Sequence, residues 1–176
     1  MLEVEHISKR YHYQKVLKDI SLQFPDAGIV AIVGPSGCGK STLLHILGGI
    51  DHDFQGDLLW NHRSVKHHLT HYRRHHVSFI FQQFHLIMWL SLKQNVSLPR
   101  FFHKQEKVSL KLEMDELKHQ SLSSLSMGQR QRLAYLRSHY HHSDILLCDE
   151  PTGSLDPQYA KAVMELLKEE SLHRLV

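Results

Sequence analysis

Two short segments of the chain contain residue types that could bind phosphate and a metal ion. The first, GPSGCGKST, places glycines around a turn that leads into Lys40 and Ser41. This is the phosphate-binding loop (P-loop) pattern, in which backbone N–H groups and a helix N-terminus surround phosphate oxygens. Lys40 would reach the β- and γ-phosphates, and the Ser41 hydroxyl would bind Mg²⁺. We therefore predict an ATP site formed by Gly34, Pro35, Ser36, Gly37, Cys38, Gly39, Lys40, Ser41 and Thr42.

The second segment ends in two adjacent carboxylates. Four apolar residues, Ile145–Cys148, predict a buried strand, and Asp149 and Glu150 follow directly. Because burying an unpaired charge is unfavourable, a strand that ends in this way needs a partner for its carboxylates. Bound Mg²⁺ would supply one: we expect Asp149 to hold the ion and Glu150 to polarise the attacking water. Together the two segments predict an ATP-hydrolysing site.

These segments must be positioned by an α/β fold. The β-prone run Gly28–Val33 predicts a fully buried parallel strand that leads into the loop. After the loop, helical spacing from Leu43 to Leu47 predicts a helix that stops at Gly48-Gly49. The first 25 residues suggest antiparallel strands, and Val77–Phe81 suggests a further strand.

The remaining segments suggest helices around that sheet. Residues 51–75 resemble a strand pair followed by a polar connector, whereas residues 86–125 suggest mixed helical segments. Helices are predicted over Ser126–His139, with an S-x-x-Q capping pattern, and over Pro157–His173. The predicted fold is a P-loop-type, mostly parallel sheet with flanking helices, an N-terminal antiparallel portion and an inserted helical subdomain at about 86–140.

Length, charge and composition exclude several classes of protein. The chain has 176 residues, which fits one domain, and a net charge of +3, which is too small to favour nucleic acid as a partner. It contains neither an apolar run of about 18 residues nor a signal-peptide pattern, so we expect a cytosolic domain. Its two cysteines, Cys38 and Cys148, form no disulfide framework.

Seventeen histidines are unusual for a chain of this length. His67, His71 and His75 would share one face if their segment were helical, and histidines spaced in this way can bind a metal. A solvated polar face is the alternative, and we favour it because no Cys or carboxylate completes a ligand set nearby.

The order of the motifs adds a family resemblance. The P-loop, LSMGQ at Leu125–Gln129 and DEPTGSLD at Asp149–Asp156 together resemble the nucleotide-binding domain of ATP-binding cassette (ABC) proteins, over nearly all of residues 1–176. The resemblance implies that Gln82 contacts Mg²⁺, supports catalysis and senses a transmembrane partner. It also implies that Tyr11 stacks on adenine, with Tyr13 as the alternative, and that Val16 lies against the nucleotide.

In such proteins ATP lies between two subunits. The resemblance implies that Ser126, Gly128 and Gln129, with Asp156 of the D-loop Ser154–Asp156, act across a dimer interface. The implied partners are a second ABC ATPase subunit and a transmembrane permease, which would hold the domain at the inner face of the membrane. Details such as LGGID are similar to the branch that serves lipoprotein release, macrolide efflux and bacteriocin export.

The sequence departs from the family pattern at two places. Met127 replaces the first glycine of the common LSGGQ form, although we expect the phosphate contacts to survive. The chain also stops where Leu175-Val176 resembles the start of a central strand, before a switch histidine, and His173 does not take that role. We expect a domain that is incomplete at its C-terminus. A non-hydrolysing ATP-binding regulatory module and a soluble ABC ATPase acting on DNA or ribosomes remain alternatives.

Overall fold

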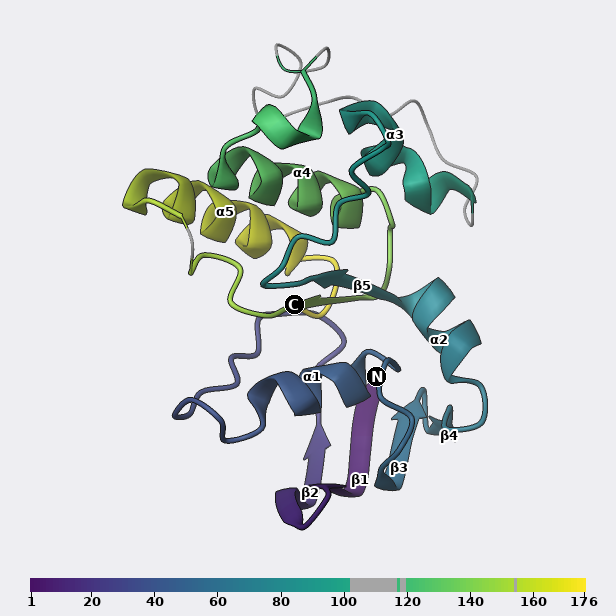
Figure 1. The fold of residues 1–176 in the computed structure, drawn as a ribbon. Coiled ribbons are helices and arrows are strands. Elements are labelled where there is room, and N and C mark those ends of the chain that lie inside the picture. The colour runs from purple at the N-terminus through teal and green to yellow at the C-terminus, as the bar shows by residue number, and fades with distance from the viewer. Residues whose placement is uncertain (102–116, 118–119, 154) are drawn as a thin grey trace.

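The computed structural model describes residues 1–101, 117, 120–153 and 155–176 (Figure 1). Part of the predicted helical subdomain, and Ser154 of the predicted D-loop, therefore lie outside the described residues. In chain order the elements are β1 (Leu2–Tyr11), β2 (Gln14–Gln23), α1 (Lys40–Leu47), β3 (Gln55–Trp60), β4 (Arg63–Ser64), α2 (Leu69–His76), β5 (Val77–Ile80), α3 (Leu92–Ser97), the 3₁₀ helices η1 (Leu98–Phe101) and η3 (Leu122–Ser124), α4 (Met127–His139), β6 (Ile145–Cys148) and α5 (Pro157–Glu170).

The N-terminal strands form an antiparallel sheet, as predicted, and their order is β2-β1-β3-β4. On β1 the side chains of Leu2, Val4 and Ile7 are buried, so one face of the sheet packs on the core. Gly56 lets β3 approach β1 closely, because its φ is +90° and an added Cβ would lie 2.4 Å from the Glu5 carbonyl oxygen.

The parallel part of the fold is built on β5 and β6, which pair from Val77↔Ile145 to Ile80↔Cys148. Alternate side chains point to opposite faces: Ile145 and Leu147 join the core that contains α1, whereas Leu146 joins α4 and α5. Figure 1 shows α1 on one side of these strands and α4 and α5 on the other. This arrangement confirms the predicted α/β class.

The predicted buried strand over Gly28–Val33 is wrong for most of its length. Gly28 forms one parallel bridge with Leu175, and Val30 N–H donates to the Val176 carbonyl oxygen at 2.8 Å. In the described structure these contacts are not extended into a strand over residues 31–33. Val33 is 88% exposed.

Leu175 itself lies where the sequence analysis places it. It forms parallel bridges with both Gly28 and Ile145, and therefore stands between the P-loop segment and β6. Leu175 therefore takes the central position predicted for it, although it forms isolated bridges and not a strand.

Two further predictions are corrected. Residues 69–76 form helix α2 rather than a polar connector, because Leu69 and Tyr72, one turn apart, bury their side chains against the core. Tyr72 also donates its hydroxyl to the Leu47 carbonyl oxygen at 2.9 Å. Helix α5 ends at Glu170 rather than at His173, and a turn follows it.

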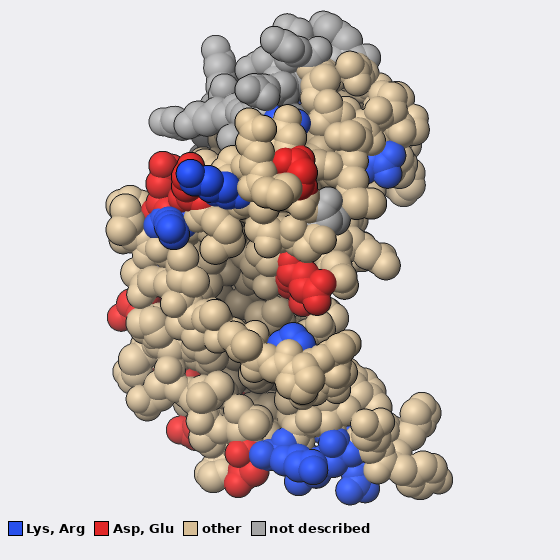
Figure 2. Space-filling view, turned by 90° about the vertical axis from the view of Figure 1, so that its left-hand side faces the viewer, with Lys and Arg blue, Asp and Glu red and all other residues tan. Residues whose placement is uncertain are grey.

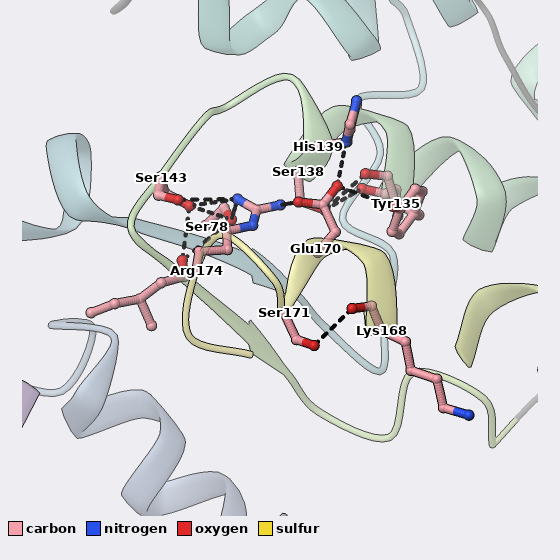
Figure 3. A network of polar contacts seen from close by, with 11 residues as sticks. Ser78, Tyr135, Ser138, His139, Ser143, Lys168, Glu170, Ser171 and Arg174 are labelled. Carbon is pink, nitrogen blue, oxygen red and sulfur yellow. Dashed lines mark hydrogen bonds and ion pairs between the residues drawn. The ribbon is translucent and has the colours of Figure 1, made fainter. Parts of the chain in front are cut away.

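A polar network joins α5, α4 and the starts of β5 and β6 (Figure 3). Arg174, which is buried, lies 2.8 Å from Glu170 and donates from Nη1 to the Ser143 hydroxyl at 3.0 Å and to the Ser78 hydroxyl at 3.4 Å. The other carboxylate oxygen of Glu170 accepts from Tyr135 of α4 at 3.2 Å and from His139. The C-terminal ends of both helices are thus fixed to the sheet through one carboxylate.

Candidate nucleotide-binding site

The N-terminus of α1 and the loop before it form a backbone cradle. Gly37 and Gly39 have φ values of +76° and +101°, which other residues rarely adopt. An added Cβ on Gly39 would lie 2.9 Å from Val16 Cγ1, so Val16 packs directly on the loop. Within the described structure no side chain caps α1. Its first N–H groups and positive dipole end therefore suit an anion.

Lys40 lies across this loop. Its ammonium donates to the carbonyl oxygens of Gly34 at 3.0 Å and Pro35 at 2.8 Å. Both acceptors are neutral, so these bonds orient the lysine without neutralising its charge. A phosphate in the cradle would meet that charge together with the helix N-terminus.

Ser41 and Asp149 come together although they are 108 residues apart in sequence. The Ser41 hydroxyl donates to Asp149 Oδ1 at 3.2 Å. Two neighbouring oxygen ligands of octahedral Mg²⁺, each about 2.1 Å from the ion, lie about 3.0 Å apart. The observed separation therefore fits a shared magnesium ion. The end of β6 is fixed because Asp149 N–H donates to the Ile80 carbonyl oxygen at 2.9 Å.

Gln82 and Glu150 form a second pair. Gln82 Nε2 donates to Glu150 Oε2 at 2.9 Å. Glu150 has a φ of +50°, an uncommon conformation for a residue with a side chain, which often marks functional sites. Beyond it, Gln131 of α4 donates to the Pro151 carbonyl oxygen, which ties this turn to the helix.

A cavity of 310 Å³ opens beside these groups, and Lys40, Asp149 and Glu150 line it together with apolar residues. The P-loop and the residues after β6 lie at the left of Figure 1, and Figure 2 looks onto that side, which is hollowed at mid-height. Burial raises the pKa of the neighbouring Cys148 thiol to about 12, so this group stays protonated near neutral pH. The predicted phosphate, metal and water-activating residues thus share one edge of the sheet.

The predicted adenine-stacking residue lies at the end of β1. Tyr11 is 46% exposed, and its hydroxyl donates to Asp51 Oδ2 at 3.1 Å while the Lys9 ammonium lies 4.8 Å from its ring centre. Tyr13, the alternative, is 99% exposed. The role of either tyrosine stays a prediction.

The residues expected to act across a dimer interface occupy helix N-termini. Ser126 and Gln129 form the predicted capping box, with Gln129 N–H donating to Ser126 Oγ at 3.2 Å. An added Cβ on Gly128 would meet Leu155 at 3.5 Å. Asp156 caps α5 by accepting from the N–H groups of Gln158 and Tyr159. None of Ser126, Gly128, Gln129 and Asp156 is among the described residues that line the cavity beside Lys40.

Sequence reasoning did not identify two residues that hold the site. Gln131 bonds the Pro151 carbonyl oxygen, and Arg137 bonds those of Phe84 and His85, which follow Gln82. These contacts join segments 20 to 53 residues apart, and no local motif records them.

The histidine pattern of residues 67–75 falls largely within helix α2, which spans Leu69–His76. His71 and His75 share a face of α2, with ring centres 4.3 Å apart. However, the described part of the chain contains no group of three or more His, Cys, Asp or Glu side chains suited to a metal ion. Nor does it contain a helix long and apolar enough to cross a membrane.

A P-loop at the start of α1, facing carboxylates at the end of a parallel strand, defines an ATP-binding domain of the P-loop class. Comparison with family models is more specific, because the model described as "ABC transporter" matches residues 17–153. The chain therefore belongs to the ABC transporter family, whose ATP-binding domains are ATPases.

Individual relatives agree with this assignment. The chain is 40% identical to the ABC transporter ATP-binding protein YxdL of Bacillus subtilis, over 99% of its own length and 73% of that protein. It is 36% identical to the lipoprotein-releasing system ATP-binding protein LolD of Treponema pallidum, over 95% of its own length and 80% of that protein. The macrolide export ATP-binding/permease protein MacB of Bdellovibrio bacteriovorus is 38% identical, but the chain covers only 28% of it.

A solved structure matches the whole described fold. The ATP-binding cassette MJ0796, a dimer in a post-hydrolysis state bound to ADP and Pi, superposes with a TM-score of 0.85 at 29% sequence identity. The match covers 100% of this chain and 86% of that one. The ABC resemblance inferred from the motifs is confirmed, including its branch.

Proposed function

We propose that this chain binds and hydrolyses Mg-ATP as the ATPase subunit of an exporter-type ABC transporter. One observation carries the catalytic part: Ser41 and Asp149 meet at 3.2 Å beside Lys40 and Glu150. The contact supplies the two oxygen ligands and the charged neighbours that a metal-bound triphosphate requires.

The phosphates would lie against the N–H groups at the start of α1, with Lys40 turning from its loop carbonyls toward the β- and γ-phosphates. When bound, Mg²⁺ would offset negative charge that develops on the phosphate oxygens. Ser41 and Asp149 would hold it.

Glu150 would accept a proton from the attacking water. Its carboxylate is oriented by Gln82, which donates to Oε2, and by the left-handed backbone at its own position. Because Oε1 is not the oxygen that receives this bond, it is the oxygen assigned to the water. With the Mg²⁺ contact that the family resemblance implies, Gln82 would act on both the base and the metal side of the site.

A second subunit would complete the site. Ser126, Gly128 and Gln129 begin α4, which packs on the opposite face of the β5–β6 sheet from α1, and Met127 between them is 59% exposed. These residues, together with Asp156, are proposed to contact the nucleotide of a partner ATPase subunit. The dimeric state of MJ0796 supports this arrangement.

Export through a membrane permease is the remaining part of the proposal. It is supported by relatives whose names refer to lipoprotein release and macrolide export. The domain would then lie at the cytoplasmic face of the membrane, bound to the permease.

The test is phosphate release by the purified chain at saturating Mg-ATP, with binding of a fluorescent ATP analogue measured in parallel. Lys40→Ala should lose binding, whereas Glu150→Gln should bind and dimerise normally but turn over about 10²–10⁴-fold more slowly. The matched control is Glu165→Gln, because Glu165 is an exposed carboxylate on α5. Undiminished turnover in Glu150→Gln would refute the assignment of the base. Nucleotide binding without any phosphate release by the unchanged chain would instead favour a non-hydrolysing module.

A further inference from the structure

Tyr11 stands on the β1–β2 hairpin, which packs against the P-loop. Across the hairpin it pairs with Gln14, and Val16, two residues further along β2, lies against Gly39 of the loop. Two residues of a strand span about 7 Å. The ring, which is 46% exposed, therefore lies close enough to the phosphate cradle to meet the base of a nucleotide bound there.

Asp51 fixes the hydroxyl end of this ring. Its Oδ2 accepts from the Tyr11 hydroxyl at 3.1 Å. Its Oδ1 accepts from the Lys9 ammonium at 2.9 Å and from the backbone N–H of Asp53 at 3.0 Å. The side chain of Asp51 is 15% exposed, so water competes little for these bonds. One carboxylate thus ties the ring to the core and to the chain that leads into β3.

Lys9 lies against one face of the same ring. Its ammonium is 4.8 Å from the ring centre of Tyr11, and its side chain is 4% exposed. Burial acts to lower the pKa of Lys9, but the hydrogen bonds and charges of Asp51 and Asp53 outweigh it and raise the pKa, so the ammonium stays charged. Because this cation covers one face of the ring, a ligand can stack on the other.

A ring that is already fixed binds a base more tightly than a ring that rotates. An exposed tyrosine samples several rotamers, and this freedom is lost when a ligand stacks on it. The bond to Asp51 removes the freedom before the ligand arrives. A buried ion pair such as Lys9–Asp51 adds little net stability compared with apolar side chains of similar volume, so the orientation of the ring is its distinctive consequence.

We propose that Asp51, held in place by Lys9, is a positioning residue for nucleotide binding: it fixes the Tyr11 ring as a platform on whose open face the base stacks. The inference rests on the proposed function, since ATP at the P-loop is the molecule that would bring a base to this ring. Neither Asp51 nor Lys9 is among the described residues that line the cavity beside Lys40. Their effect on the nucleotide would therefore pass through Tyr11.

The experiment measures the affinity of the full chain for Mg-ATP and for Mg-tripolyphosphate, which can occupy the P-loop but has no base. The readout is the ratio of the two affinities, because a general structural effect would weaken both ligands alike. Tyr11→Leu should lower the affinity for ATP about 30-fold and leave that for tripolyphosphate unchanged. Tyr11→Phe, which removes the hydroxyl alone, should lower the ratio about fivefold.

Asp51→Asn tests the positioning role itself. Two donors, Lys9 and the Asp53 N–H, hold an oxygen at the Oδ1 position, so the new amide nitrogen would replace the oxygen that accepts from Tyr11. The ratio should again fall about fivefold. The double variant with Tyr11→Phe should fall no further than either single change, because both remove the same bond. The matched control is Asp53→Asn, whose carboxylate is 98% exposed, and it should keep the ratio.

Three results would overturn the inference. The first is an unchanged ratio in Tyr11→Phe, which decides the matter alone if circular dichroism shows that Asp51→Asn does not fold. The second is a fall in Asp51→Asn that adds in full to that of Tyr11→Phe, and the third is an equal loss of both ligands. In each case the P-loop proposal stands as long as the unchanged chain binds tripolyphosphate. A chain that binds neither ligand would instead refute the proposed nucleotide site, and this inference with it.

Discussion

The network around Glu170 predicts a large energetic coupling that can be measured. Arg174 is only 6% exposed, and the side chain of Glu170 is 15% exposed. Glu170→Gln keeps the shape of the side chain but leaves the Arg174 charge buried without its carboxylate. Removing one partner of a buried pair costs about 3–5 kcal/mol. We expect a loss near the lower limit, about 3 kcal/mol, because Ser143 and Ser78 still accept from the guanidinium.

A double-mutant cycle isolates the pair. Arg174→Met should also cost about 3 kcal/mol, since Glu170 would retain only His139 and Tyr135. The double variant buries no charge, so it should lose about 3 kcal/mol rather than the sum, a coupling of about 3 kcal/mol. Urea unfolding followed by circular dichroism at pH 7 measures these values, with the exposed neighbour Glu169→Gln as control. Additive effects, or a loss below about 1 kcal/mol for Glu170→Gln, would show that the network does not hold the helices.

The pH dependence gives an independent readout. Burial acts to raise the pKa of Glu170, but the His139 hydrogen bond and the Arg174 charge outweigh it and lower the pKa below its ordinary value of 4.5. A carboxyl group with a depressed folded-state pKa stabilises the protein above its unfolded pKa, and this stabilisation disappears as the pH falls through the folded value. The unfolding free energy should therefore fall between about pH 5 and pH 3 more steeply in the unchanged chain than in Glu170→Gln.

Three further predictions concern the sheet and the site. Gly56→Ala should abolish folding in a thermal melt, since its Cβ would lie 2.4 Å from the Glu5 oxygen, whereas Gly128→Ala, with no contact closer than 3.5 Å, should fold. Asp51→Asn should cost about 2 kcal/mol at pH 7 in urea unfolding, and the difference should shrink as the pH falls below 3.8, the ordinary pKa of this carboxyl group. The reason is that hydrogen bonds and charge from buried Lys9 outweigh burial and lower the pKa of Asp51, so its contribution is lost as the pH falls through that value. Gln82→Ala should slow phosphate release about tenfold while ATP binding is unchanged, and an equal loss of both would contradict its role in orienting Glu150.

The sequence was most informative where a local pattern determines the backbone. The strand pattern of residues 2–24, the glycine turn before α1 and the Ser126 capping box all appear as predicted. In each case the neighbouring residues themselves supply the hydrogen bonds or the glycine conformation that the element needs.

Elements that depend on distant partners were predicted less well. Apolar composition suggested a buried strand at Gly28–Val33, but a strand also needs a neighbour, and beyond Val30 the described residues provide none there. Helix α2 was missed because only Leu69 and Tyr72 mark its buried face among polar residues. In both cases the structure of the segment depends on contacts with residues elsewhere in the chain, which its own sequence does not record.

The parallel pairing of β5 and β6 explains how the candidate site arises from residues that no motif connects. In their register Ile80 stands opposite Cys148, so Gln82 and Glu150 each lie two residues beyond the same rung. Both strands run in the same direction, and their following residues emerge at one edge of the sheet, where the Gln82–Glu150 bond forms across 68 residues of sequence. A shift of one residue in this register would turn every side chain of the shifted strand to the opposite face, moving Leu146 and Leu147 out of their separate cores. The cores on the two faces therefore fix the register, and the register places the base beside the glutamine that orients it.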